Sequence, residues 1–218
     1  MKLFFVLTIV VAAALSFSSC SSSSSKPQTF CDTVCLKDSL KFSGNHVLKP
    51  YVYISTKDCH ADSITWSYKG MGINKKTGFT YLLNATVNLN RDFVRCFIKD
   101  TAWAWVLFND CLTGRGFQLK LPYSKSQNFS IKSSGINSLD KKFSLSDNLI
   151  AYTDRGNIYV EDMATGKKAM MTFGQKLDID YDVIHEHIDS VNITNTRIWT
   201  KVKIGDAWKE LEKTIILE

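Results

Sequence analysis

The sequence lacks most of the residues and motifs on which enzymes rely. It has four histidines among 218 residues, so candidates for a general base are scarce. It contains no G-x-S-x-G elbow, no H-E-x-x-H motif, no P-loop and no dinucleotide-binding fingerprint. We therefore expect a non-enzymatic protein that uses no cofactor.

Proline and long apolar runs are also rare. Only three prolines occur, and short runs of β-branched and aromatic residues alternate with turns of Asn, Asp, Ser and Gly. With 44% apolar and 12% aromatic residues, the chain can bury a core, which excludes a disordered protein. The apolar run Leu3–Leu15 is shorter than the ~20 residues that a membrane-spanning helix needs.

The N-terminus has the layout of a secretory signal. Lys2 precedes the apolar run, and small residues then lead to Cys20. The segment Phe17-Ser18-Ser19-Cys20 resembles the lipobox of bacterial lipoprotein precursors. The resemblance implies removal of residues 1–19, acylation of Cys20 and, because Ser21 is not Asp, residence at the outer membrane of a Gram-negative bacterium. The alternative is an ordinary signal cut near Ala12–Ala14, with Cys20 lost.

Charge and composition divide the remainder of the chain. Residues 20–29 form a serine-rich tether. Residues 30–135 are a basic β region, and residues 136–218 are an acidic β region that could be continuous with it. Residues 20–135 hold 15 basic and 7 acidic side chains, whereas residues 136–218 hold 11 and 14. A basic region beside a lipid anchor suits anionic headgroups, and we expect no nucleic-acid partner for an exported protein.

The expected fold is all-β, with antiparallel sheets in a sandwich or two small modules. The short apolar runs predict the strands Tyr51–Ser55, Ile64–Tyr68, Phe79–Leu83, Phe93–Ile98, Trp103–Phe108, Phe117–Leu121, Phe129–Ile131, Leu149–Thr153, Ile158–Glu161, Ala169–Phe173, Thr196–Ile204 and Lys213–Leu217.

The hairpin from residue 93 to residue 108 can be predicted in more detail. A four-residue loop, Lys99–Ala102, would place Cys96 opposite Trp105 on an apolar face that also holds Trp103. We expect both tryptophans to be buried; the alternative is an exposed platform for a sugar or a peptide. If Cys20 carries lipid, an odd number of cysteines remains: Cys31, Cys35, Cys59, Cys96 and Cys111. Cys96 is our candidate for the unpaired thiol.

The stretch from Leu149 to Phe173 resembles one blade of the WD40-like repeats in TolB-type periplasmic proteins. The shared features are an apolar strand ending in Tyr152, a turn from Asp154 to Gly156, a second strand and a Thr165-Gly166 turn. No second copy occurs, and a closed propeller needs at least four blades. A simple three-stranded meander produces the same pattern.

One segment suggests metal chemistry. On a strand, His185 and His187 would share a face with Asp182 nearby, which suits a metal site. Apolar residues recur there at three- and four-residue steps, however, and predict a short helix near residues 181–189. A helix turns the two histidines about 200° apart. We therefore expect no metal.

Several triplets of Asp, then Ser or Thr, then an apolar residue or Thr are similar to the O-glycosylation acceptor of some Gram-negative bacteria. The two that best fit exposed loops would modify Thr33 and Thr101.

Together these features predict a lipid-anchored cell-envelope protein that acts as a binding or structural module. An envelope protein or a glycan is the expected partner, besides the membrane that holds the lipid. The alternatives are a metal-dependent envelope hydrolase that uses residues 178–189, and an accessory subunit of a larger envelope assembly.

Overall fold

The described part of the chain is mostly β-strand with very little helix, as the sequence predicts. The computed structural model describes residues 30–31, 36–84, 86–154, 156–172 and 187–218. Within these residues one α-helix and one 3-10 helix are described in full, α1 Phe79–Leu83 and η1 Arg91–Phe93, and the single residue His187 is also helical. No helix in these ranges is long and apolar enough to cross a membrane. The predicted secretory signal, which is expected to be a helix before its removal, lies outside the described residues.

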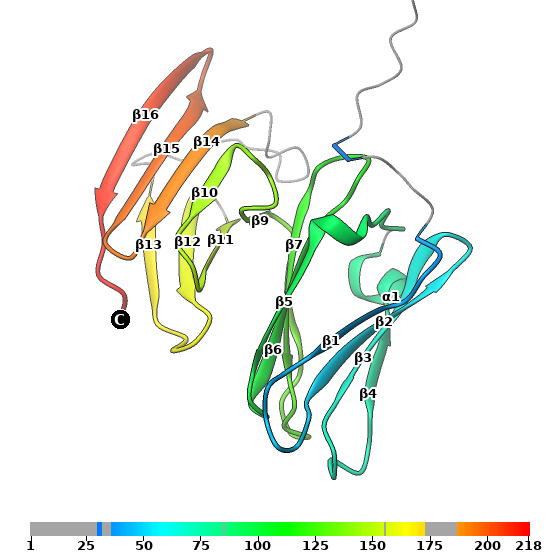
Figure 1. The fold of residues 1–218 in the computed structure, drawn as a ribbon. Coiled ribbons are helices and arrows are strands. Elements are labelled where there is room, and N and C mark those ends of the chain that lie inside the picture. Colours follow the sequence, from blue (N-terminus) through cyan, green and yellow to red (C-terminus); the bar gives the residue numbers. More distant parts are fainter. Residues whose placement is uncertain (1–29, 32–35, 85, 155, 173–186) are drawn as a thin grey trace, which may run out of the picture.

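Two four-stranded antiparallel sheets form the first half of the protein (Figure 1). The first has the order β1-β2-β3-β4, with strands β1 Leu40–Ser43, β2 Tyr51–Lys57, β3 His60–Ser67 and β4 Lys75–Gly78. The second has the order β5-β6-β7-β8, with strands β5 Val94–Lys99, β6 Trp103–Asn109, β7 Gly116–Pro122 and β8 Ser130–Lys132. In both sheets the strand order follows the sequence, so short hairpin connections suffice.

The inner faces of these two sheets share one hydrophobic core. Alternate residues of each strand point into it, such as Val52 and Ile54 of β2, which are fully buried. Aromatic rings join the layers: Phe108 of β6 stacks on Phe117 and meets Phe79 edge to face. Burying each such side chain contributes about 1.5–3 kcal/mol.

Two further sheets form the second half. One is antiparallel, with the order β13-β12-β11-β9 and strands β9 Gly135–Ile136, β11 Leu149–Asp154, β12 Asn157–Asp162 and β13 Lys168–Thr172. The other has the order β10-β14-β15-β16, with a parallel β10–β14 pair and strands β10 Phe143–Leu145, β14 Ile188–Thr194, β15 Arg197–Ile204 and β16 Ala207–Thr214. A second core of aliphatic residues, together with Phe143 and Met171, lies between them.

Strands β11, β12 and β13 form the three-stranded meander that the sequence predicts between Leu149 and Phe173. Their sheet is completed by β9. Of the segment predicted to be helical near residues 181–189, only the last three residues are described, and the first of them, His187, is helical. Ile188 and Asp189 belong to strand β14.

Two predicted strands differ from the structure. The strand predicted at Lys213–Leu217 lies earlier, as β16, and shares only Lys213 and Thr214 with the prediction. The other, Phe79–Leu83, forms the α-helix α1. Phe79, Leu82 and Leu83 are spaced three and four residues apart, so one helical turn directs all three to the first core. Asn84 adopts a left-handed conformation (φ 52°) and its N–H donates to Thr80 O at 2.9 Å, which ends the helix.

The predicted register of the β5–β6 hairpin is wrong by one residue. The loop has three residues, since Lys99 pairs with Trp103, and Asp100 within it has a positive φ of 44°. Cys96 therefore lies opposite Val106 instead of Trp105. Neighbouring residues of a strand point to opposite faces, so this one-residue shift separates Cys96 from the two tryptophans. Cys96 points toward the first core, and both tryptophans lie on the outer face of the sheet.

That outer face packs against the second half of the protein. Trp105 is only 4% exposed and lies in a small cluster with Ile150 and Met163. Gln118 of β7 is fully buried there, and its Nε2 donates to Ala151 O and, at 3.4 Å, to Ile136 O. The predicted burial of Trp105 is thus confirmed, and the covering layer is the second half of the chain.

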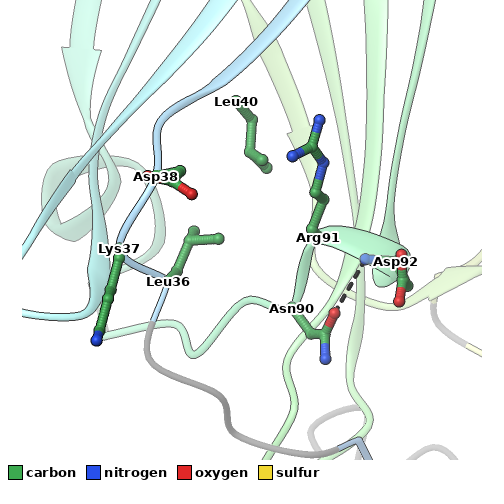
Figure 2. Close-up of a pocket in the computed structure, with 7 residues that line it drawn as sticks. All are labelled: Leu36, Lys37, Asp38, Leu40, Asn90, Arg91 and Asp92. Carbon is green, nitrogen blue, oxygen red and sulfur yellow. Dashed lines mark hydrogen bonds between the residues drawn. The ribbon is translucent and has the colours of Figure 1, made fainter.

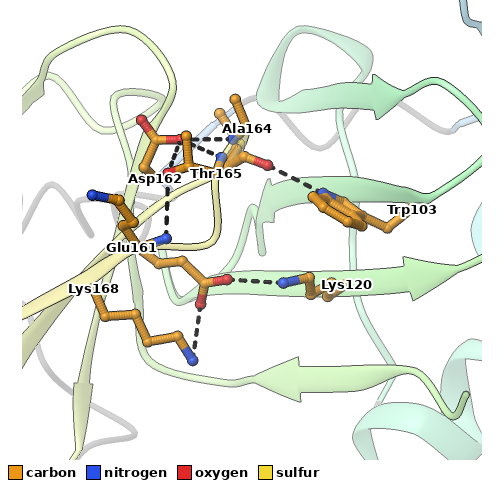
Figure 3. Close-up of polar contacts among 9 residues, drawn as sticks. Trp103, Lys120, Glu161, Asp162, Ala164, Thr165 and Lys168 are labelled. Carbon is orange, nitrogen blue, oxygen red and sulfur yellow. Dashed lines mark hydrogen bonds and ion pairs between the residues drawn. The ribbon is translucent and has the colours of Figure 1, made fainter. Parts of the chain in front are cut away.

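Polar contacts border this interface (Figure 3). Trp103 is partly buried and its Nε1 donates to Met163 O at 3.1 Å. Lys120 Nζ donates to the buried carboxylate of Glu161 at 2.9 Å and lies 5.0 Å from the centres of the Trp103 and Trp105 rings. An exposed platform made of both tryptophans is therefore excluded.

The turn that carries Met163 is fixed by Asp162. Burial alone would raise the pKa of the Asp162 carboxyl, but hydrogen bonds from Thr165 and Ala164 lower this pKa below its usual range. The carboxylate consequently remains charged and holds the turn in the shape that presents Met163 O to Trp103 (Figure 3).

Candidate binding groove

Most of the site residues predicted from the sequence are not among the residues that the structure describes. Cys20, Thr33, Asp182 and His185 are outside the described residues. His187 is partly buried just before β14, and the described ranges hold no group of three or more potential metal ligands.

The triplets that resemble O-glycosylation acceptors differ in the solvent exposure of their Ser or Thr side chain. Thr101 is partly exposed at the tip of the β5–β6 hairpin, between the exposed Asp100 and Ala102. Ser63 belongs to the same kind of triplet but is only 4% exposed within β3. Thr101 consequently remains a candidate acceptor, whereas Ser63 is inaccessible in the folded protein.

A hollow that could hold a ligand lies between β1 and the η1–β5 segment; we call it the edge groove (Figure 2). β1 and β5 are the terminal strands of their two sheets, so the groove runs along the open side of the first core. A cavity of 460 Å³ occupies its wider part, which is within the usual range for ligand sites. Its lining residues are Leu36, Lys37, Asp38, Leu40, Asn90, Arg91 and Asp92.

The edge groove continues along β5 into a second cavity of 370 Å³. This part shares Leu40, Arg91 and Asp92 with the first cavity, and its further lining residues are Lys41, Phe42, Val94, Arg95 and Cys96. The groove closes beyond it, because a Cβ on Gly44 would lie only 2.8 Å from Ile98 Cγ2. The edge groove is therefore open near η1 and closed where β1 and β5 converge.

Basic side chains outnumber acidic ones around the edge groove. Lys37, Lys41, Arg91 and Arg95 line it, against Asp38 and Asp92. None of the four cations forms an ion pair with a carboxylate in the described part of the chain. Their charge is therefore available to an incoming anion.

The backbone and one ring hold two of these cations in place. Arg95 Nη1 donates to Asp92 O at 3.1 Å and to Val94 O at 3.2 Å, which fixes its guanidinium at the start of β5. Lys41 Nζ lies 6.0 Å from the centre of the Tyr51 ring on the neighbouring strand. Both charged groups are thus positioned before any ligand arrives.

Cys96 is the one free cysteine among the described residues, as the sequence predicts. Cys31 and Cys111 form a disulfide, and Cys59 is also disulfide-bonded. Burial raises the pKa of the Cys96 thiol to about 12. A thiol with so high a pKa stays protonated at neutral pH, so it contributes apolar surface to the groove and is a poor nucleophile.

Sequence reasoning missed this groove because it missed β1. The signal was present but short: Leu40 and Phe42 alternate with Lys41 and Ser43 over only four residues. The groove also joins segments about fifty residues apart in the sequence, which no local pattern reveals.

Comparison of the chain with protein-family models, with curated proteins and with solved structures finds no match.

Proposed function

We propose that this protein is a non-enzymatic binding module of the bacterial cell envelope, anchored through lipid on Cys20. The edge groove is its binding site. The observation that carries the proposal is that one groove combines an apolar floor, two terminal β-strands and a rim of cations that form no ion pair with any described carboxylate.

The shape of the site favours an extended peptide. A terminal strand leaves one row of backbone N–H and C=O groups available, to which an extended segment adds as a further strand. In such a segment, alternate side chains face opposite sides. One set of apolar side chains would then contact Leu36, Leu40 and Val94, while acidic ones would face the lysines and arginines. The ligand class is thus an acidic, apolar segment of an envelope partner.

The chemistry of the edge groove supports binding over catalysis. Its lining residues include no histidine, and the single thiol has a raised pKa. Nothing in this lining combines an activated nucleophile with a base. Binding, by contrast, needs only the contacts and charges described above.

A defined peptide pair tests the groove. The full chain carrying Cys20→Ser is titrated with two fluorescent peptides of equal length, one alternating Asp with Leu and the other Lys with Leu. Fluorescence anisotropy should show binding of the acidic peptide, and Lys41→Glu with Arg91→Glu should weaken it at least about tenfold. Lys203→Glu, an exposed change outside the groove, is the charge control. Equal binding of both peptides, or no effect of the groove variants, would refute the site.

The anchor is tested separately by mass spectrometry of the mature N-terminus. We expect a terminus at Cys20 that carries acyl chains. An unmodified terminus at any residue would remove the anchor from the proposal and leave the groove untouched.

A further inference from the structure

Two loops at one end of the first pair of sheets carry apolar side chains in full contact with solvent. Residues 44–50 connect β1 to β2, and residues 68–74 connect β3 to β4. Val47 is 83% exposed and Ile73 is 65% exposed, with Leu48 also exposed beside Val47. Lys69 N donates to Leu48 O at 2.7 Å, so the two loops are joined. Large side chains this exposed mark interaction surfaces when they cluster.

A third loop brings further basic charge to the same end. Residues 123–129 follow β7, and Lys125 Nζ lies within 3.8 Å of the position that a Cβ on Gly72 would occupy. Lys75 fixes this loop, since its Nζ donates to Pro122 O at 3.1 Å and to Gln127 O at 2.8 Å. The three loops thus form one surface, which we call the loop end.

The loop end has a one-sided charge. The three loops hold Lys49, Lys69 and Lys125, and the first two residues of β4 next to them are Lys75 and Lys76, so this end carries five lysines; residues 44–50, 68–78 and 122–129 contain no Asp or Glu. Four of these lysines are exposed and pair with no carboxylate in the described part of the chain: Lys49, Lys69, Lys76 and Lys125. The β5–β6 hairpin, joined to this end by Tyr123 N donating to Ala102 O at 3.0 Å, adds Lys99 and Asp100, which offset each other.

We propose that the loop end binds the surface of an anionic lipid bilayer. Val47 and Ile73 insert below the headgroups, and the surrounding lysines contact the headgroup phosphates. Lysines close to an anionic surface strengthen binding, and apolar side chains add to this when they enter the interface. An acidic protein partner fits less well, because lysine is depleted in protein interfaces and these apolar side chains protrude from loops instead of lining a cavity.

This inference goes beyond the proposed function and does not rest on it. A lipid anchor on Cys20 would still allow the loop end to reach the membrane. Phe30 contacts the opposite end of the sheets, where its N–H donates to Cys111 O. The ten residues from Cys20 to Thr29 span at most about 35 Å when extended. A strand of seven residues, such as β6, is about 24 Å long. A chain anchored at Cys20 can therefore still place its loop end on the same membrane.

The test places a fluorescent probe in the loop end, so that it reports contact of this surface with lipid. Insertion of the apolar N-terminus into the vesicles would not produce the same signal. The full chain carrying Cys20→Ser receives either Ile73→Trp or Tyr81→Trp. Tyr81 is even more exposed, at 82%, but lies on α1, at the other end of β4. Each variant is mixed with vesicles of brominated phosphatidylcholine, with or without about one third phosphatidylglycerol. We expect bromine quenching and a blue shift, relative to the parent chain, for Ile73→Trp on the anionic vesicles only.

Charge reversal completes the test. In the Ile73→Trp background, Lys49→Glu with Lys125→Glu should weaken vesicle binding at least about tenfold. The matched control is Lys57→Glu with Lys203→Glu, which changes the net charge equally at exposed positions elsewhere and should have a smaller effect. The proposal is overturned if Ile73→Trp is not quenched, if it is quenched equally on neutral vesicles or at Tyr81→Trp, or if both lysine pairs have the same effect.

Discussion

Replacing Gly116 by alanine should weaken the contact between the two halves of the protein. Gly116 begins β7, and its backbone lies directly against Gly135 of β9. A Cβ on Gly116 would lie 2.1 Å from Gly135 O and 2.9 Å from Gly135 C. An ordinary contact between such atoms is about 3.5 Å. Both atoms belong to the backbone, so no flexible side chain can move aside, and the strands must separate.

Separation of these strands should cost about 2–4 kcal/mol of unfolding free energy. Overpacking a buried site costs about 1–3 kcal/mol, and the hydrogen bonds of the buried Gln118 across this contact contribute about 1 kcal/mol more. Urea unfolding of the full chain, followed by tryptophan fluorescence, measures the loss because Trp105 is buried at this interface.

Gly78→Ala is the control for Gly116→Ala. A Cβ on Gly78 would meet its nearest atom, Asp62 O, at 3.7 Å, and its φ of −83° suits alanine. Gly78 is the N-cap of α1, where alanine is less favourable than glycine, so this variant should cost at most about 1 kcal/mol. If Gly116→Ala unfolds at the same urea concentration as Gly78→Ala, the two backbones do not lie in the contact described.

Three further predictions concern single interactions. In a double-mutant cycle, Lys120→Met and Glu161→Gln should show a coupling of about 1 kcal/mol, limited because Lys120 is partly exposed; additive losses would contradict the ion pair. Burial raises the pKa of the Cys96 thiol in the folded chain to about 12, so the unfolded chain loses the thiol proton at a lower pH than the folded chain. The free energy of unfolding should therefore fall between about pH 9 and pH 12. Cys96→Val should lessen that fall in pH-dependent urea unfolding, whereas an identical pH profile would contradict the assignment. The Cys31–Cys111 disulfide closes a separation of 80 residues, so Cys31→Ala with Cys111→Ala should lower the unfolding free energy by about 2–4 kcal/mol; a loss under about 0.5 kcal/mol would contradict its role.

The sequence predicted elements whose signal is local. β2, β6 and β7 carry β-branched and aromatic runs, and the turns after Asp154 and Ile204 contain glycine, so their patterns could be identified. Phe79–Leu83 was ambiguous, because a five-residue apolar run fits a strand or one helical turn until its neighbours are known.

The remaining features depend on contacts that no local pattern contains. The β5–β6 register depends on whether the loop has three or four residues, and that difference alone decides which face holds Cys96. The edge groove depends on two terminal strands from different sheets converging at Gly44 and Ile98. The free thiol was identified correctly, although the neighbour predicted for it, Trp105, is on the opposite face.

Photocrosslinking in intact cells tests the central proposal, that the edge groove binds an envelope partner, most directly. A photoreactive amino acid replaces Lys37 or Arg91 at the rim of the groove, or the exposed Lys203 as a control. We predict one discrete adduct from both rim positions, absent from the Lys203 position and lost when Lys41→Glu and Arg95→Glu are added. No adduct at the rim, or the same products from all three positions, would contradict a ligand in the edge groove.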